Sequence, residues 1–280
     1  MTSLNFHLND LIRVLGFTTI YTALGLLLPV QGYISPAFAL GTVLTGVLYG
    51  LVLWYASLYL PVSRKVRILV IWIAVYVIQM LNPVLEGFFF STQFEGHPEL
   101  IFGAVIFGTI LTLPTALAAG FLFQPKGALK SFKEMRANYF GGFSRNSLAL
   151  RLIVSSVLWM GIYFVFGSLV GPIVLPYYTV DGVGYSLTLP SIEIVLLLQT
   201  FRGFIYVFSV LPLVMALDTG KKPLALILTA LLYIGGALAV FIISDQFPLF
   251  LRMVHGIELF ADSLFAGLAI SYLLGRTQKN

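Results

Sequence analysis

The chain has few charged residues and no cysteine. Charged side chains make up 10% of its 280 residues and hydrophobic ones 59%, whereas a soluble domain usually carries about 25% charged residues. Mean hydropathy is +0.98, so the composition is that of a chain that crosses a membrane several times. Because cysteine is absent, disulfides and thiolate chemistry are excluded.

Familiar catalytic signatures are missing as well. The sequence has no Walker A motif, no G-x-S-x-G nucleophile turn and no H-E-x-x-H pair. It lacks the paired glutamates followed by arginine of intramembrane CAAX-type proteases, and its three histidines are too few for the haem-ligating pairs of a haem A synthase. We therefore predict no cofactor, and the question of whether the protein is an enzyme stays open.

Long apolar runs are what the chain does have. A bilayer core about 30 Å thick takes roughly 20 apolar residues as a helix, and eight segments qualify. We predict an all-α, polytopic membrane helix bundle, and we interpret the first run as an uncleaved span because the N-terminal residues lack the usual basic n-region of a signal peptide. The predicted spans are 12–32, 38–60, 67–90, 100–123, 150–174, 190–215, 223–244 and 250–274.

The basic residues fall on one side of this eight-span arrangement. Every Lys and Arg except Arg202 and Arg252 lies in or beside the connections of that side. Since cytoplasmic loops carry the excess of positive charge, we predict both termini in the cytoplasm and a location in the plasma membrane. The net charge of +5 is then a topology signal and not a sign of nucleic-acid binding. The charged residues of the opposite connections are Glu95, Glu99, Asp181 and Asp245.

A basic stretch at 124–150 divides the chain into two four-span halves, 1–123 and 151–280. We interpret it as a cytoplasmic linker beside anionic headgroups, with docking of a partner as the alternative. The halves echo each other weakly, as in IYTALGLLLPV and IYFVFGSLVGPIV. With four spans in each half, a duplication would be parallel, although the echo is about as strong as apolar sequence gives by chance.

The last apolar run carries four ionisable residues on one helical face. Arg252, His255, Glu258 and Asp262 are spaced i, i+3, i+6 and i+10, which at ~100° per residue places them within roughly a third of the circumference. A charge at the bilayer centre costs about 2.5–3.5 kcal/mol on insertion scales. The four residues therefore mark either a site or an internal polar lock.

Two other spans bring polar residues to a similar depth. Gln79, Asn82 and Glu86 share one face of the third span, and Arg202 lies near the middle of the sixth. Because Arg202 and Asp262 have opposite charges at matching depth, we predict that they pair. The pair is either a structural lock between spans or the lining of a polar cavity open to the outside.

Three functions fit this cluster. The first is a carrier or channel-like protein for a small solute, with the cluster as binding site or proton relay; a chain this small suggests a homodimer. The second is a membrane-embedded enzyme for a lipid-like substrate, with His255 or Glu258 as general base and Arg202 as headgroup clamp. The third is an accessory or assembly subunit whose cluster only fixes helix packing. The candidate site residues are Asn82, Glu86, Arg202, His255, Glu258 and Asp262.

Metal binding is a further alternative for the same residues. His255, Glu258 and Asp262 have side chains that bind zinc, and the loop 95–99 could bring His97 to the mouth of the cavity. One helix rarely supplies a whole metal site, so we predict none. A proton relay that includes Glu86 and a static hydrogen-bonded network both remain open.

Overall fold

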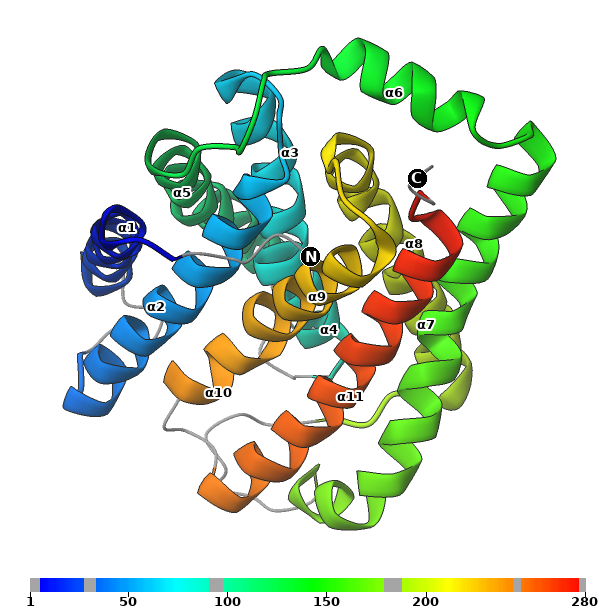
Figure 1. Cartoon of the computed structure of the whole chain (residues 1–280). Coiled ribbons are helices and arrows are strands. Elements are labelled where there is room, and N and C mark those ends of the chain that lie inside the picture. The colour runs from blue at the N-terminus through cyan, green and yellow to red at the C-terminus, as the bar shows by residue number, and fades with distance from the viewer. Residues whose placement is uncertain (1–5, 28–33, 91–97, 179–187, 244–247, 277–280) are drawn as a thin grey trace.

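The computed structural model describes residues 6–27, 34–90, 98–178, 188–243 and 248–276, and the regular structure in these ranges is helical (Figure 1). Within them, eight helices are long and apolar enough to cross a membrane. The bounds of these helices differ from the predicted spans by a few residues. This confirms the prediction of an all-α, multi-pass membrane bundle.

In each half three spans are single α-helices, and the third span is interrupted. The first half consists of α1 (Leu8–Leu27), α2 (Pro36–Leu58), a third span made of α3 (Arg64–Tyr76), η1 (Val77–Leu81) and α4 (Asn82–Phe90), and α5 (Pro98–Leu122). The second consists of α7 (Arg145–Val174) with η3 (Leu175–Tyr178), α8 (Ile192–Ala216), a span made of α9 (Lys221–Tyr233), η4 (Ile234–Leu238) and α10 (Ala239–Ile243), and α11 (Leu249–Leu274). The surface helix α6 (Phe132–Gly141) lies between the halves.

The two interruptions, η1 and η4, are π-helical turns that contact each other. At the end of η1 the Asn82 N–H donates to the Val77 carbonyl, directly before Pro83, whose missing N–H removes an α-helical bond. In η4, a Cβ on Gly235 would lie 2.6 Å from the Tyr49 hydroxyl oxygen, so glycine allows this close approach. Such turns are frequent at functional sites.

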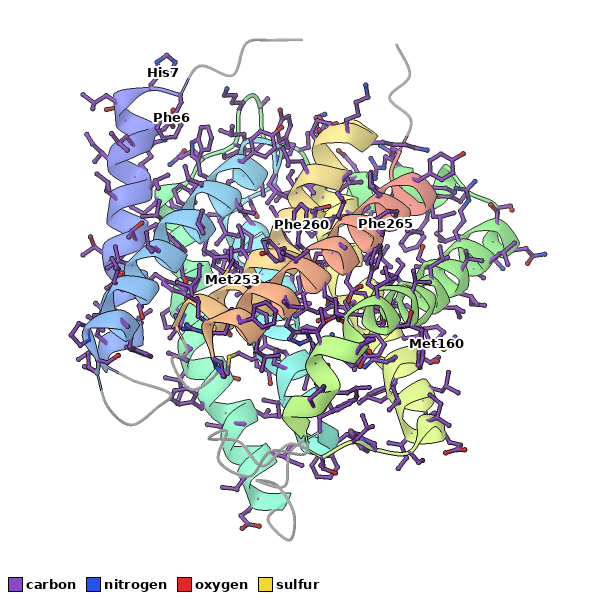
Figure 2. All side chains as sticks on the ribbon, turned by 90° about the horizontal axis from the view of Figure 1, so that it is seen from below. Phe6, His7, Met160, Met253, Phe260 and Phe265 are labelled. Carbon is purple, nitrogen blue, oxygen red and sulfur yellow. The ribbon has the colours of Figure 1, made fainter. Side chains whose placement is uncertain are left out.

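The outside of the bundle is apolar. The side chains of Met253, Phe260 and Phe265 on α11 are exposed (Figure 2), although the two phenylalanine rings also contact aromatic rings of α9 and α7. Soluble monomers rarely expose large continuous apolar surfaces, whereas this surface matches the hydrocarbon of a bilayer. The fold is therefore that of a protein in contact with lipid.

The helix order around α11 decides which polar residues can meet. Figure 1 shows α11 between α9 and α7, and its main contacts are with these two helices. The main contacts of α8 are instead with α7 and with the third span, including α4. Thus α7 packs against both the helix of Arg202 and the helix of Asp262, and these two helices have few contacts with each other.

Helix α6 lies across one end of the bundle, inside the predicted linker 124–150 (Figure 1). Its residues Met135 and Tyr139 are buried, so part of the linker packs on the bundle as a helix. We use the name basic-end latch for the bonds that four side chains of this end donate to backbone carbonyls. They are Arg67 to Gly120 (2.9 Å), Tyr139 to Leu274 (3.1 Å), Arg151 to Leu273 (2.7 Å) and Arg276 to Met135 (2.5 Å).

The division into two halves stays a prediction, and so does the duplication. In the structure the halves contact each other through several pairs, among them α2 with α9 and α3 with α8.

Candidate functional site

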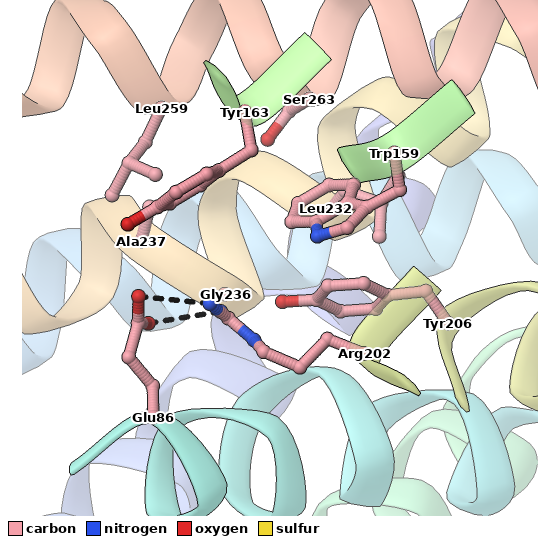
Figure 3. Close-up of a pocket in the computed structure, with 10 residues that line it drawn as sticks. All are labelled: Glu86, Trp159, Tyr163, Arg202, Tyr206, Leu232, Gly236, Ala237, Leu259 and Ser263. Atoms are coloured by element: carbon pink, nitrogen blue, oxygen red, sulfur yellow. Dashed lines mark hydrogen bonds and ion pairs between the residues drawn. The ribbon is translucent and has the colours of Figure 1, made fainter. Parts of the chain in front are cut away.

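Arg202 is buried near the middle of α8, and three side chains hold its guanidinium group. Nε donates to Asn82 Oδ1 at 2.6 Å and Nη1 to Gln199 Oε1 at 3.1 Å. The two terminal nitrogens contact the two oxygens of Glu86 at 2.8 Å each (Figure 3). This is the bidentate geometry that makes arginine–carboxylate pairs strong, and it joins α4 to α8.

The predicted pairing of Arg202 with Asp262 is wrong. The guanidinium group bonds to Glu86 instead, and neither carboxylate oxygen of Asp262 accepts a hydrogen bond in the described part of the chain. Matching depth along two helices does not make them close partners, since α8 and α11 have few contacts with each other. Asp262 is nevertheless almost fully buried, with 1% of its surface exposed.

The polar face of the third span is also divided. Asn82 and Glu86 contact Arg202, whereas Gln79 donates to the Tyr21 hydroxyl of α1 at 2.9 Å. Gln79 lies within the π-helical turn η1, and this turn changes the register of the face before Asn82 and Glu86.

On α11, His255 and Glu258 form a close pair. His255 Nδ1 lies 2.5 Å from Glu258 Oε2, and the spacing i, i+3 places both on one side of the helix. Glu258 is buried, whereas the side chain of His255 is 34% exposed. Asp262 follows Glu258 by one helical turn, so three ionisable groups are stacked along α11 as the sequence predicts.

A narrow hollow adjoins the guanidinium group. Most of its space is open to the surroundings, and the enclosed part is about 20 Å³, room for about one water molecule. In Figure 3 the hydroxyl of Tyr206 points toward Arg202, and the aromatic rings of α7 lie on the other side of the hollow. The lining residues are Glu86, Trp159, Tyr163, Arg202, Tyr206, Leu232, Gly236, Ala237, Leu259 and Ser263.

Sequence reasoning missed most of this lining. Tyr206 follows Arg202 by one helical turn and shares its face, which is a usable signal. Trp159 and Tyr163 have no such signal, because aromatic residues are frequent throughout the apolar runs of this chain. The Trp159 ring centre lies 5.9 Å from Arg202 Cζ, within the range of a cation–π contact.

The charges of the site can be counted. We call Asn82, Glu86, Gln199, Arg202, His255, Glu258 and Asp262 the acid–base cluster. Asp262 lies close enough to the other four ionisable members to interact with their charges. With Arg202 and a protonated His255 the cluster has two positive charges against three carboxylates. A buried net charge is costly. For a net charge of zero, one of the three acids of the cluster must also be protonated.

The described ranges contain no set of side chains suited to bind a metal ion. No group of three or more His, Asp or Glu residues there is arranged to hold a metal ion. His97 and Glu95, which the loop alternative needs, lie outside the described residues.

No family model matches this sequence, and neither a curated protein nor a solved structure is detectably similar to it. The function is therefore inferred from the site alone.

Proposed function

We propose that this multi-pass membrane protein is a carrier that moves a small solute together with protons, and that the acid–base cluster is its site. The observation that carries the proposal is the Asp262 carboxylate, which is buried at the middle of α11 without a hydrogen-bond partner in the described structure. Intramembrane acids in such surroundings are typical of proton relays.

The neighbours of Asp262 support a relay. Glu258 lies one turn away and holds His255 in a short contact of 2.5 Å. Imidazole takes up and releases protons near neutral pH, so His255 can exchange a proton with Glu258, and Asp262 is the next acid along the helix. The pair lies toward the end of α11 that is remote from the basic-end latch. By the positive-inside rule we assign that end to the outside.

The spans around the hollow support a site that changes shape. Two of them, the third and the seventh, are interrupted by π-helical turns, and Gly236 of the second turn lines the hollow. Interrupted spans near the midplane are a recurring feature of carrier sites.

A structural lock in an accessory subunit is the second candidate. It is favoured by the contacts of Arg202 with Asn82 and Glu86, which join α8 to α4. A lock explains the arginine but gives no role to the unpartnered Asp262 or to the hollow. Association of two copies stays a prediction.

The test is solute-dependent proton movement in sealed vesicles. Purified protein is reconstituted into vesicles that contain a pH-sensitive dye, and succinate, lysine, glycine or glucose is added outside. One of these solutes is expected to acidify the lumen faster than in protein-free vesicles. Asp262→Asn should slow this at least about a hundredfold, the lower end of the range for losing one general acid–base group.

Asp10→Asn is the matched control, because Asp10 lies on α1 and accepts a hydrogen bond from Trp54 away from the cluster. Its rate is expected to equal that of the parent. If no solute moves protons, or if Asp262→Asn moves them at the parental rate, the proposed function is wrong.

A further inference from the structure

We propose that the hollow beside Arg202 binds the carboxylate group of a small organic anion, and that Glu86 occupies this position while the solute is absent. This inference deepens the proposed carrier function and rests on it for the coupling to protons. The binding itself follows from how the partners of Arg202 differ.

Two partners of the guanidinium group are fixed. Asn82 and Gln199 are fully buried, with 0% exposed surface each, and their amide oxygens accept from Nε and Nη1. Amides do not ionise, and neither residue lines the hollow. These two bonds set the orientation of the guanidinium plane and leave its Nη1–Nη2 edge directed at the third partner.

The third partner, Glu86, can be exchanged. Its side chain is 38% exposed although it contacts a buried arginine, and it lines the hollow. It also contributes what a ligand carboxylate would contribute, two oxygens at 2.8 Å from two guanidinium nitrogens. A solute with the same group can replace it with the same geometry.

The walls of the hollow select an organic anion. Trp159, Tyr163 and Tyr206 provide aromatic surface, and Leu232 and Leu259 provide aliphatic surface. An inorganic anion would leave these walls without a partner, whereas the carbon skeleton of a small acid would pack on them. The enclosed space is only about 20 Å³, room for about one water molecule, so a solute carboxylate fits only in the place that Glu86 leaves when it moves aside.

Charge balance couples this exchange to a proton. When a carboxylate replaces Glu86 on Arg202, the cluster gains one negative charge and Glu86 loses its cation. Taking one proton onto the Glu86 carboxylate restores the earlier net charge, and no bond other than the new O–H is formed. Glu86 interacts with the charge of His255, which places the relay on α11 within reach of this step.

Trp159 is a built-in reporter for binding. The sequence has three tryptophans, so Trp54→Phe and Trp72→Phe leave only the ring that lies 5.9 Å from Arg202 Cζ. Succinate is titrated into this protein in detergent while the fluorescence is recorded. A saturable change with succinate and none with neutral succinamide is expected. In weakly buffered solution with a pH indicator, binding should take up one proton.

Substitutions then separate the partners. Glu86→Gln removes the competing carboxylate and should tighten succinate binding on the order of tenfold, the scale of one charge-assisted hydrogen bond. It should also abolish the proton uptake. Arg202→Lys keeps the charge without the planar fork and should weaken binding by a similar factor. The matched control Glu193→Gln alters an exposed acid of α8 and should bind like the parent.

Several results would overturn the inference. If Glu86→Gln weakens succinate binding or leaves it unchanged, then succinate does not take the place of Glu86 on Arg202. If ethanolamine binds and Glu86→Gln abolishes its binding, the site is a cation site. If sulfate competes as well as succinate does, the site is one for inorganic anions. If succinate binds as expected but no vesicle assay shows proton movement, the carrier function fails and the site stands. If protons move with lysine or glucose and succinate does not bind, the carrier function stands and the carboxylate site fails.

Discussion

The buried arginines of this protein donate to two different kinds of acceptor. In the basic-end latch Arg67 is buried and donates to the carbonyls of Val62 and Gly120, at 3.4 and 2.9 Å. In the acid–base cluster Arg202 donates to side chains. A backbone carbonyl cannot take up a proton or move away, whereas a carboxylate can do both. The latch is therefore suited to hold helices, and the cluster is suited to exchange partners.

Removing the cation of the cluster should have the largest effect on stability. We expect Arg202→Gln to lower the free energy of unfolding by about 3 kcal/mol, because Glu86 loses the cation with which it forms an ion pair. Glu86→Gln in the same chain should restore part of this loss. Denaturant unfolding in detergent measures both. A double variant no more stable than Arg202→Gln would show that the two side chains are not coupled.

Breaking the latch should have an intermediate effect. Arg67→Gln is expected to lower the free energy of unfolding by about 2 kcal/mol, the scale of hydrogen bonds from a charged donor. Its acceptors are carbonyls, so succinate binding to the remaining folded protein should equal that of the parent. Arg64→Gln, an exposed neighbour on the same helix, is the control. Loss of succinate binding in Arg67→Gln would mean that latch and cluster are not independent.

The smallest effect at neutral pH is expected for Tyr139→Phe, about 1 kcal/mol for one neutral hydrogen bond to Leu274. Burial raises the pKa of Tyr139 from 10.0 to about 12. The unfolded chain thus releases this proton at lower pH than the folded one, so the stability from Tyr139 is complete below pH 10 and is lost as pH rises toward 12. The stability of Tyr139→Phe should decline less steeply than that of the parent as pH rises through this window, as thermal unfolding at several pH values would show. Equal slopes would contradict the assignment.

The spans could be predicted because hydropathy is a local property of the chain. The stacking of His255, Glu258 and Asp262 on one face of α11 could be predicted as well, since helical periodicity alone sets it. The partner of Arg202 could not, because depth along a helix contains no information on which helices are neighbours. The face of the third span was divided for a similar reason, since the π-helical turn before Pro83 interrupts its period.

The sequence by itself determined a membrane bundle of about eight spans, the side on which its basic residues gather, and the polar residues that lie within the spans. Only the tertiary structure decided that Glu86 and not Asp262 pairs with Arg202, that Asp262 is buried without a hydrogen-bond partner among the described residues, and that aromatic rings of α7 line the hollow. The physical reason is that the free-energy cost of burial is a property of each residue along the chain, whereas pairing depends on which helices face each other. Here α8 and α11 each pack against α7 more than against each other, and the two charges that the sequence had matched do not pair.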